Sequence, residues 1–358
     1  MKENKIGLII MNGAQELGKK VSDRISNILS VSDEELIISH ECPRFTTGEG
    51  KAQLLKSVRG RDVYIISDVT NYTCEFFMRG KKTYMSPDEH YMDIKRVVSA
   101  CGGKCSRLTV IMPYLYGGRQ DRRNGRESLD AAFVLKEITK MGVHNIITFD
   151  AHNHCVENAI PNNGFDNIMP IYQMIKAIVR SSAIDIANTV MVSPDEGAIK
   201  RNAEYARWFK MELGMFYKVR DLANTSNGQN PIKKHDYMGG NIAEKSALVA
   251  DDAIATGNTL LSVANNLKQL GAKNTSFLTT FPQFTEGLDK FDQAYQKGII
   301  HRVFGTNLIY RSPDLLNREW YIDVDISKYL AYIIISIYQE TSINSLLNPA
   351  EKIKRFLD

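Results

Sequence analysis

Short apolar runs rich in β-branched residues alternate along this chain with longer segments of helical periodicity. Such runs are typical of strands that are buried on both faces, and parallel strands need helical crossovers between them. Strands are expected at 6–11, 62–67, 108–113, 145–150, 189–193, 215–218, 247–250, 276–280 and 303–308. Helices are expected at 16–29, 91–100, 130–141, 196–209, 259–270 and 329–338. The pattern predicts an α/β protein whose sheets are mainly parallel and flanked by helices.

The chain is long enough for two domains. Its 358 residues exceed the length of one ordinary domain, and the expected elements fall into two blocks. Pro, Gly and Asn interrupt the pattern at 161–167, which reads PNNGFDN. Domains are therefore expected at 1–163 and 164–358, with the last helix a candidate to pack back on the first domain. Two long polar stretches, 71–90 and 221–240, are predicted to be loops and candidate lids.

The charge balance argues against several classes of protein. Lys and Arg number 45 against 41 Asp and Glu, a net charge of +4 with the two signs interleaved. Neither nucleic acid nor a membrane is therefore an expected partner. The apolar runs are too short for a membrane span or a signal-peptide core, which predicts a cytoplasmic protein.

The cysteine pattern argues against a disulfide framework. The chain has five cysteines, an odd number at irregular spacing. Cys101 and Cys105 have the spacing of half a zinc site, but no second pair follows them. Reduced, mostly structural thiols are the prediction.

The clearest local motif is ALVADDAIATGNT at 247–259. An apolar strand is expected to end in Asp251 and Asp252, whose carboxylates can accept hydrogen bonds from sugar hydroxyls. The small-residue turn that follows opens a helix, and the N–H groups at a helix start bind anions. The motif therefore predicts a site for a sugar phosphate. The alternative is an ordinary turn capped by a threonine.

A second motif, VSPDEGAIKR at 192–201, also combines a strand end, an acid and a helix start. Asp195 is placed to bind a hydrated metal ion there, with Lys200 and Arg201 close by. The alternative is a capped helix with solvated charges.

A third motif is FDAHNH at 149–154, at the end of an expected strand. Residues two apart share a face of an extended segment, so Asp150 and His152 are expected to converge. Mg²⁺ prefers oxygen ligands and retained water, so the imidazole would meet the ion alongside carboxylate, water and phosphate. The alternative is a pair of structural histidines, His152 and His154.

Two basic segments complete the pattern. The run RQDRRNGR at 119–126 has four arginines, whose guanidinium groups suit the oxygens of a polyphosphate. Lys218 and Arg220 lie where the strand FYKVR enters the second polar stretch. A cationic loop that closes over a reacting phosphate would stabilise charge and exclude water. An exposed charged turn is the alternative for the arginine run.

Taken together, these segments resemble the ribose-phosphate pyrophosphokinase family, also called phosphoribosyl pyrophosphate synthetases. The resemblance rests on RFTTGE, SVRGRDVYIIS, MPYLYGGRQDRR, FDAHNH, VSPDEGAIKR, FYKVR and ADDAIATGNT, in that order along the chain. It implies two phosphoribosyltransferase-like domains with the active site between them, and a homo-oligomer, a dimer or hexamer, in which a neighbouring subunit completes the ATP site. It also implies transfer of the β,γ-diphosphoryl group of ATP to the C1 hydroxyl of ribose 5-phosphate, with Mg²⁺ as cofactor.

The resemblance also implies a role for individual residues. Those matching the ATP site, with the first as the adenine-stacking ring, are Phe45, Thr47, Glu49, Arg119, Gln120 and Asp121. Those matching the metal site are His152, Asp195 and Asp150. The pair that meets the transferring group is Lys218 and Arg220. Those matching the ribose 5-phosphate site are Asp251, Asp252, Ala255, Thr256, Gly257, Asn258 and Thr259.

The chain departs from the family pattern at three of its turn positions. Ala255 replaces the third acid of the ribose 5-phosphate turn, Asn258 replaces its second glycine, and Glu196 adds a negative charge beside Asp195. We expect catalysis to survive, because the charged residues of the pattern are present. The alternatives are a regulatory homologue that binds nucleotide or sugar phosphate without catalysis, a related phosphoribosyltransferase, and an enzyme of different sugar-phosphate or nucleotide specificity, which Asn258 and the pair Gly117 and Gly118 would determine.

Overall fold

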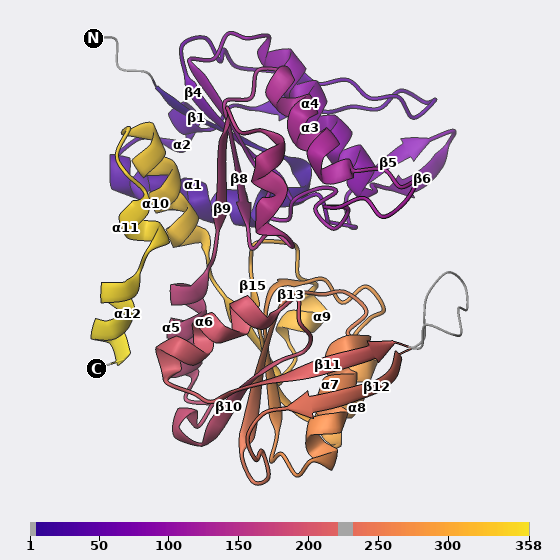
Figure 1. Cartoon of the computed structure of the whole chain (residues 1–358). Coiled ribbons are helices and arrows are strands. Elements are labelled where there is room, and N and C mark those ends of the chain that lie inside the picture. The colour runs from indigo at the N-terminus through magenta and orange to yellow at the C-terminus, as the bar shows by residue number, and fades with distance from the viewer. Residues whose placement is uncertain (1–4, 221–231, 358) are drawn as a thin grey trace. The chain divides into compact units, whose positions relative to one another are not determined.

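The computed structural model describes residues 5–220 and 232–357, and these form two compact units. Unit 1 contains the described residues up to Pro170, together with Asn307–Tyr310 and Asp325–Asn348. Unit 2 contains the described residues of Ile171–Thr306, Arg311–Val324 and the segment that follows Pro349. Figure 1 labels the helices and strands of both.

Unit 1 is built on a parallel five-stranded sheet of order β1-β4-β7-β8-β9. Its strands are β1 (Ile6–Ile10), β4 (Asp62–Ile66), β7 (Arg107–Ile111), β8 (Asn145–Phe149) and β9 (Gly164–Ile168). Its helices are α1 (Gln15–Leu29), α2 (Asp33–Leu36), α3 (Pro87–Cys101), α4 (Asp130–Lys140), α10 (Ser327–Tyr338) and α11 (Asn344–Leu347). Helices α3 and α4 share an apolar core with one face of the sheet, and α1 packs against α10. The buried strands and their flanking helices account for the continuous apolar runs.

Two antiparallel ribbons also belong to unit 1. One consists of β2 (His40–Glu41) and β3 (Gln53–Leu54), and the other of β5 (Glu75–Met78) and β6 (Lys81–Tyr84). A capping box starts α3, because Ser86 Oγ accepts from the Glu89 N–H and the Glu89 carboxylate accepts from the Ser86 N–H. The stretch 71–90, expected as a loop, therefore contains a hairpin and the first turn of a helix.

Unit 2 is built on a seven-stranded sheet of order β12-β11-β10-β13-β14-β15-β16, parallel except for the antiparallel pairing of β12 with β11. Its strands are β10 (Thr189–Ser193), β11 (Leu213–Arg220), β12 (Ile232–Met238), β13 (Ser246–Ile254), β14 (Thr275–Pro282), β15 (Ile300–Thr306) and β16 (Tyr321–Val324). Its helices are α5 (Ile171–Ser181), α6 (Ile199–Phe209), α7 (Asn258–Gln269), α8 (Asp289–Gln296), α9 (Pro313–Leu316) and α12 (Ala350–Leu357). The sheet and helices enclose a separate apolar core.

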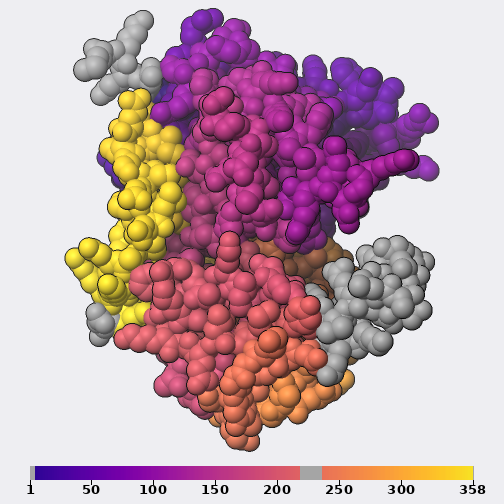
Figure 2. All heavy atoms as spheres, viewed as in Figure 1, coloured from indigo at the N-terminus to yellow at the C-terminus, as the bar shows by residue number. Residues whose placement is uncertain are grey.

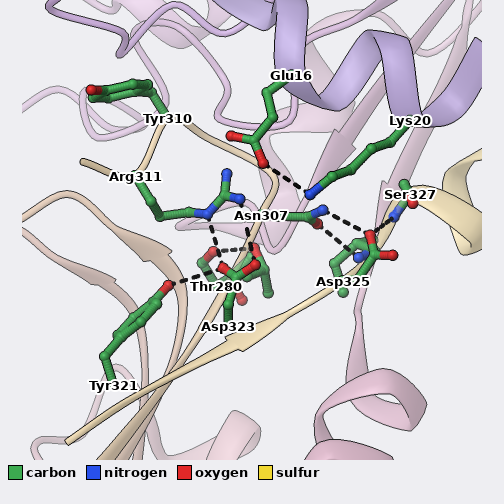
Figure 3. Close-up of polar contacts among 12 residues, drawn as sticks. Glu16, Lys20, Thr280, Asn307, Tyr310, Arg311, Tyr321, Asp323, Asp325 and Ser327 are labelled. Atoms are coloured by element: carbon green, nitrogen blue, oxygen red, sulfur yellow. Dashed lines mark hydrogen bonds and ion pairs between the residues drawn. The ribbon is translucent and has the colours of Figure 1, made fainter. Parts of the chain in front are cut away.

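The C-terminal part of the chain contributes to both units. In unit 1, the Asn307 side chain donates to Asp325 at 2.7 Å and accepts from the Ile326 N–H at 2.7 Å, which orients the start of α10 (Figure 3). In unit 2, buried Arg311 donates to Asp323 at 2.9 Å (Figure 3). In Figure 2, the yellow residues of 325–348 form part of the surface of unit 1.

The structure confirms the predicted α/β fold with mainly parallel sheets flanked by helices. Several elements extend further than the sequence suggests, and strand β9 was not predicted. Strand β13 continues to Ile254, and β9 adds residues 164–168 to the sheet of unit 1. Helix α10 lies in unit 1 and α12 in unit 2. Of the predicted loop 221–240, residues 221–231 lie outside the described residues, and the prediction is wrong for 232–238, which form strand β12. No described helix is both long and apolar enough to span a bilayer.

Candidate functional site

The loop 44–50 presents an exposed aromatic ring at the end of the β2–β3 ribbon. The Phe45 N–H donates to Glu49 O at 2.7 Å, and the Gly48 N–H donates to Phe45 O at 2.9 Å. Gly48 has φ +99°, a conformation that favours glycine. Thr47 Oγ1 donates to the Glu49 carboxylate at 3.0 Å. The structure thus brings together Phe45, which is 55% exposed, and its two predicted polar companions. Such a ring can stack on a planar base.

The arginine-rich turn 119–126 is held by its own polar side chains. Gln120 donates to Ser128 O at 2.9 Å and to Arg122 O at 3.2 Å. The Asp121 side chain is 3% exposed and accepts a hydrogen bond from Asn153 of the FDAHNH segment. Arg119 is exposed. Of the three predicted nucleotide contacts, Arg119 is the one whose side chain is most open to a ligand, while Gln120 and Asp121 shape the turn.

Asp150 and His152 follow β8 but do not continue it in an extended conformation. Asp150 is buried and has φ +38°, in the left-handed region, and its N–H donates to Ile168 O at 3.0 Å. His152 is exposed. The sequence predicted that the two side chains lie on one face of an extended segment. That geometry is wrong, since the chain turns at Asp150.

In unit 2, Asp195 lies in the turn between β10 and α6. Its carboxylate accepts from the Ala198 N–H at 3.2 Å, and its carbonyl accepts from Ser193 Oγ at 2.7 Å. Helix α6 begins at Ile199 rather than at the expected Glu196, because residues 196–198 form this capped turn. Glu196 is exposed. Its charge is therefore screened by solvent, which weakens the repulsion it would exert on a bound anion.

The adjacent acids of β13 differ in burial. The expectation that the strand ends at these acids is wrong, since β13 pairs with β14 from Ala247 to Ile254. Successive side chains of a strand alternate, and accordingly Asp251 is half-buried whereas Asp252 is buried. Asp251 faces the α6 side, where its carboxylate lies 3.9 Å from Arg201. The Asp251 and Asp252 side chains also interact with each other.

Burial raises the pKa of Asp251 to about 8, and the nearby Asp252 carboxylate adds to the effect, whereas Arg201 opposes it. The Asp251 carboxyl group of the folded protein therefore stays protonated at pH values at which the same group in the unfolded chain has already lost its proton. The free energy of unfolding should fall as the pH rises from about 4 to about 8 and then level off.

We expect Asp251→Asn to remove this pH dependence, because the amide has no proton to lose. The free energy of unfolding of the variant, relative to the wild type, should be higher at about pH 8 than at about pH 5. Urea denaturation of both proteins at the two pH values measures the difference. An identical difference at both pH values would contradict the raised pKa.

A buried asparagine, which the sequence analysis did not single out, joins the two turns of unit 2. Asn202 of α6 donates to Ala250 O at 2.8 Å and accepts from the Ala250 N–H at 2.9 Å. It also donates to Ala198 O at 2.8 Å. Ala250 directly precedes Asp251, so Asn202 positions the acid relative to the Asp195 turn. Its only sequence signal is an amide on the otherwise apolar face that includes Ala198, Tyr205 and Phe209.

The turn 255–259 leads from β13 into α7. Gly257 has φ +74°, and a Cβ atom at this position would lie 2.3 Å from Cε2 of Phe291. Phe291 belongs to an aromatic cluster with Phe284 and Trp320, whose ring centroids lie 4.9 and 5.6 Å from its own. The turn thus packs against this aromatic cluster, at a distance that only glycine allows.

The departures from the family pattern leave the helix start accessible. Asn258 is the first residue of α7, and its side chain accepts a hydrogen bond from Lys290 at 3.0 Å. Thr256 and Asn258 are exposed, and Thr259 is half-buried. Because the N–H groups of the first helical turn have no partner within a helix, this turn has the geometry of an anion site.

Lys218 and Arg220 lie in β11, whose backbone pairs Lys218 with His235 and Arg220 with Ile232 of β12. Their side chains are outside the described part of the chain, as are residues 221–231. The structure therefore places the backbone of the predicted catalytic pair at the end of a paired strand.

The described residues fit a metal ion that arrives with a phosphorylated substrate. Within 5–220 and 232–357, no three His, Cys, Asp or Glu side chains form a group that would itself hold a metal ion. Mg²⁺ usually keeps several waters and is held by one or two carboxylates together with phosphate oxygens. In unit 2, Asp195 and Asp251 are close enough to influence each other electrostatically. They offer a donor set of this kind.

Two family models match most of the chain. The N-terminal domain of ribose phosphate pyrophosphokinase matches residues 6–142, and the phosphoribosyl transferase domain matches residues 166–301. The ribose-phosphate pyrophosphokinase of Pasteurella multocida is 27% identical over 95% of this chain and 98% of its own length. That of Haemophilus influenzae is 27% identical over 96% and 99%. The crystal structure of phosphoribosylpyrophosphate synthetase from Mycobacterium smegmatis covers 94% of this chain with a TM-score of 0.75 at 20% identity.

Proposed function

Because the chain belongs to the ribose-phosphate pyrophosphokinase family, we propose that its two units cooperate in one reaction. The enzyme transfers the β,γ-diphosphoryl group of ATP to the C1 hydroxyl of ribose 5-phosphate, giving phosphoribosyl pyrophosphate and AMP. The observation that carries this assignment is that each unit has groups suited to a different substrate. Unit 1 carries an exposed ring beside polar groups and an arginine-rich turn, and unit 2 carries an anion turn beside a strand acid.

In unit 1, Phe45 stacks on adenine, while Thr47 and Glu49 contact the base edge. Arg119 neutralises the phosphates, with Gln120 and Asp121 holding its turn in shape. An exposed ring of this kind binds best when a second surface covers it, which supports a homo-oligomer, a dimer or hexamer, with an ATP site completed by a neighbouring subunit.

In unit 2, the turn 255–259 and the start of α7 hold the 5-phosphate of the acceptor. Asp251 accepts hydrogen bonds from the ribose hydroxyls, with the more deeply buried Asp252 beside it. The carboxylate missing at Ala255 removes a negative charge from beside this phosphate. Asn258 is drawn toward Lys290. Both departures are therefore compatible with anion binding.

In the reaction, the C1 oxygen attacks the β-phosphorus, the bond between that phosphorus and the oxygen bridging to the α-phosphate breaks, and the hydroxyl proton is released. Lys218 and Arg220 neutralise the charge that accumulates on the transferring group. In-line transfer of this kind depends on positioning and charge neutralisation and needs no covalent nucleophile.

Mg²⁺ is the proposed metal, with Asp195 as its carboxylate ligand in unit 2 and with Asp150 and His152 as the candidate groups of unit 1. When bound, it neutralises phosphate charge and orients the reacting oxygens. Because Asp150 is buried at a left-handed turn, its part in this site is to position the segment that carries His152. Location in the cytoplasm stays a prediction.

The direct test is phosphorus NMR of the protein mixed with ATP, Mg²⁺ and ribose 5-phosphate. We expect AMP and phosphoribosyl pyrophosphate to form in equal amounts. Ribose without its phosphate is the matched control substrate, and it should give no product because the anion turn has nothing to bind. Binding of both ligands without AMP formation would favour the regulatory homologue. Consumption of phosphoribosyl pyrophosphate with a free base, in place of its synthesis, would favour a phosphoribosyltransferase.

A further inference from the structure

The β5–β6 hairpin of unit 1 has two chemically different faces. Paired residues of an antiparallel ribbon lie on one face, and successive residues alternate. Phe76 and Met78 therefore share a face, and Phe77 and Tyr84 share the opposite one. Phe76 and Met78 are half-buried, whereas Phe77 is 66% and Tyr84 58% exposed. The hairpin thus packs through its Phe76 face, which we call the inner face.

The inner face packs on the loop 44–50, and the hairpin turn bonds to it. The Arg79 N–H donates to Thr46 O at 2.8 Å. Met78 covers Gly48 so closely that a Cβ atom at Gly48 would lie 2.6 Å from the Met78 sulfur. The hydrogen bonds from Phe45 N–H to Glu49 O and from Gly48 N–H to Phe45 O join residues of the loop itself, so the hairpin contacts add order to the loop from outside it.

Phe76 closes a charged cluster beneath the same loop. The Arg44 guanidinium carbon lies 5.2 Å from the centre of the Phe76 ring, a cation–π contact. Arg44 also donates to the Asp93 carboxylate at 2.8 Å, and both side chains are only 4% exposed. Arg96 donates to the other oxygen of Asp93 at 2.8 Å. Phe76 therefore helps to hold Arg44, the first residue of the loop, against helix α3.

We propose that the β5–β6 hairpin holds the loop 44–50 in the conformation that presents Phe45 to adenine, with Phe76 as a positioning residue for ATP. This rests on the proposed function, which assigns the loop to ATP. A loop that is ordered before binding loses less conformational entropy when the ligand arrives, so the hairpin raises ATP affinity without touching the nucleotide. The acceptor site in unit 2 is not affected.

The test compares Phe76→Ala with Phe77→Ala, which remove the same ring from opposite faces of one hairpin. The first readout is hydrogen exchange of residues 43–52 without ligand, and the second is the Kd and KM for ATP beside the KM for ribose 5-phosphate. For Phe76→Ala we expect the amides of Phe45 and Gly48 to exchange about tenfold faster, ATP affinity to fall about tenfold and the KM for ribose 5-phosphate to change less than about twofold. Phe77→Ala should match the wild type in all of these.

Equal changes in both variants, or unchanged exchange and ATP affinity in Phe76→Ala, would overturn the proposal. A uniform loss of protection throughout unit 1 in Phe76→Ala would also overturn it, because the role would then be general stability. A failure of the proposed function can be distinguished from a failure of this proposal. Wild-type protein that forms no AMP with both substrates refutes the reaction, whereas the exchange and ATP-binding arms still decide whether the hairpin orders the loop.

Discussion

Replacing Lys218 with alanine is expected to lower the kcat for AMP formation by about three orders of magnitude. The ammonium group of Lys218 is proposed to neutralise charge that develops only as the diphosphoryl group transfers, so its loss should affect kcat more than the KM for either substrate. The backbone of β11 is held by its pairing with β12, including the pair Lys218 and His235. The free energy of unfolding should therefore change little.

The matched control is Lys273→Ala, which removes the same charge from an exposed position in unit 2 outside the proposed site. Quench-flow or steady-state assays of AMP formation measure both variants, and urea denaturation confirms that both are folded. A kcat for Lys218→Ala within about tenfold of the wild type would refute the assignment of the pair Lys218 and Arg220. A comparable loss in Lys273→Ala would show that the effect is only one of net charge.

Replacing Gly257 with alanine is expected to lower the free energy of unfolding by about 2–4 kcal/mol and to abolish binding of ribose 5-phosphate. Two effects add. A side chain at φ +74° is strained, and the new Cβ would lie 2.3 Å from Cε2 of the Phe291 ring. The Phe291 ring has little room to move away, because it packs against Phe284 and Trp320. The turn that carries the proposed anion site must then move.

Gly287→Ala separates the two effects. Gly287 lies in the same unit at φ +78°, but a Cβ atom there would meet nothing within 4 Å. Its replacement should show the backbone strain alone, about 1 kcal/mol, and leave ribose 5-phosphate binding unchanged. Urea denaturation and calorimetric titration with ribose 5-phosphate compare the two variants. Equal losses of stability in both would mean that the contact with Phe291 contributes nothing.

The fold class could be predicted from sequence because its signal is local. Continuous apolar runs mark buried parallel strands, and the expected strands at 62–67 and 145–150 agree with β4 and β8 to within one residue. The hairpin β5–β6 could not be found in this way. Its strands are mixed in polarity, and its turn places Arg79 at φ +51° before Gly80 at φ +75°, where Asn or Asp is the usual signal.

The candidate site could be predicted from the sequence only in part. The glycine turn before α7 follows β13 as the sequence predicted, and the Phe45 N–H, in a segment identified by the resemblance, donates to Glu49 O within one short loop. Asp150 adopts a left-handed conformation in place of the extended geometry from which its convergence with His152 was inferred. Strand β13 continues past Asp251 and Asp252 to Ile254, whereas the sequence predicted that it ends at these acids. Both differences concern the backbone conformation.

The sequence by itself determined the α/β fold, the family and the short motifs, because periodicity and turn chemistry depend on residues only a few positions apart. Only the tertiary structure decided what supports those motifs. Asn202 holds Ala250 from 48 positions away, and Arg44 reaches Asp93 from 49. Such pairs depend on which buried surfaces the helices and strands share, and burial is what makes an unpaired amide or charge costly enough to require its partner.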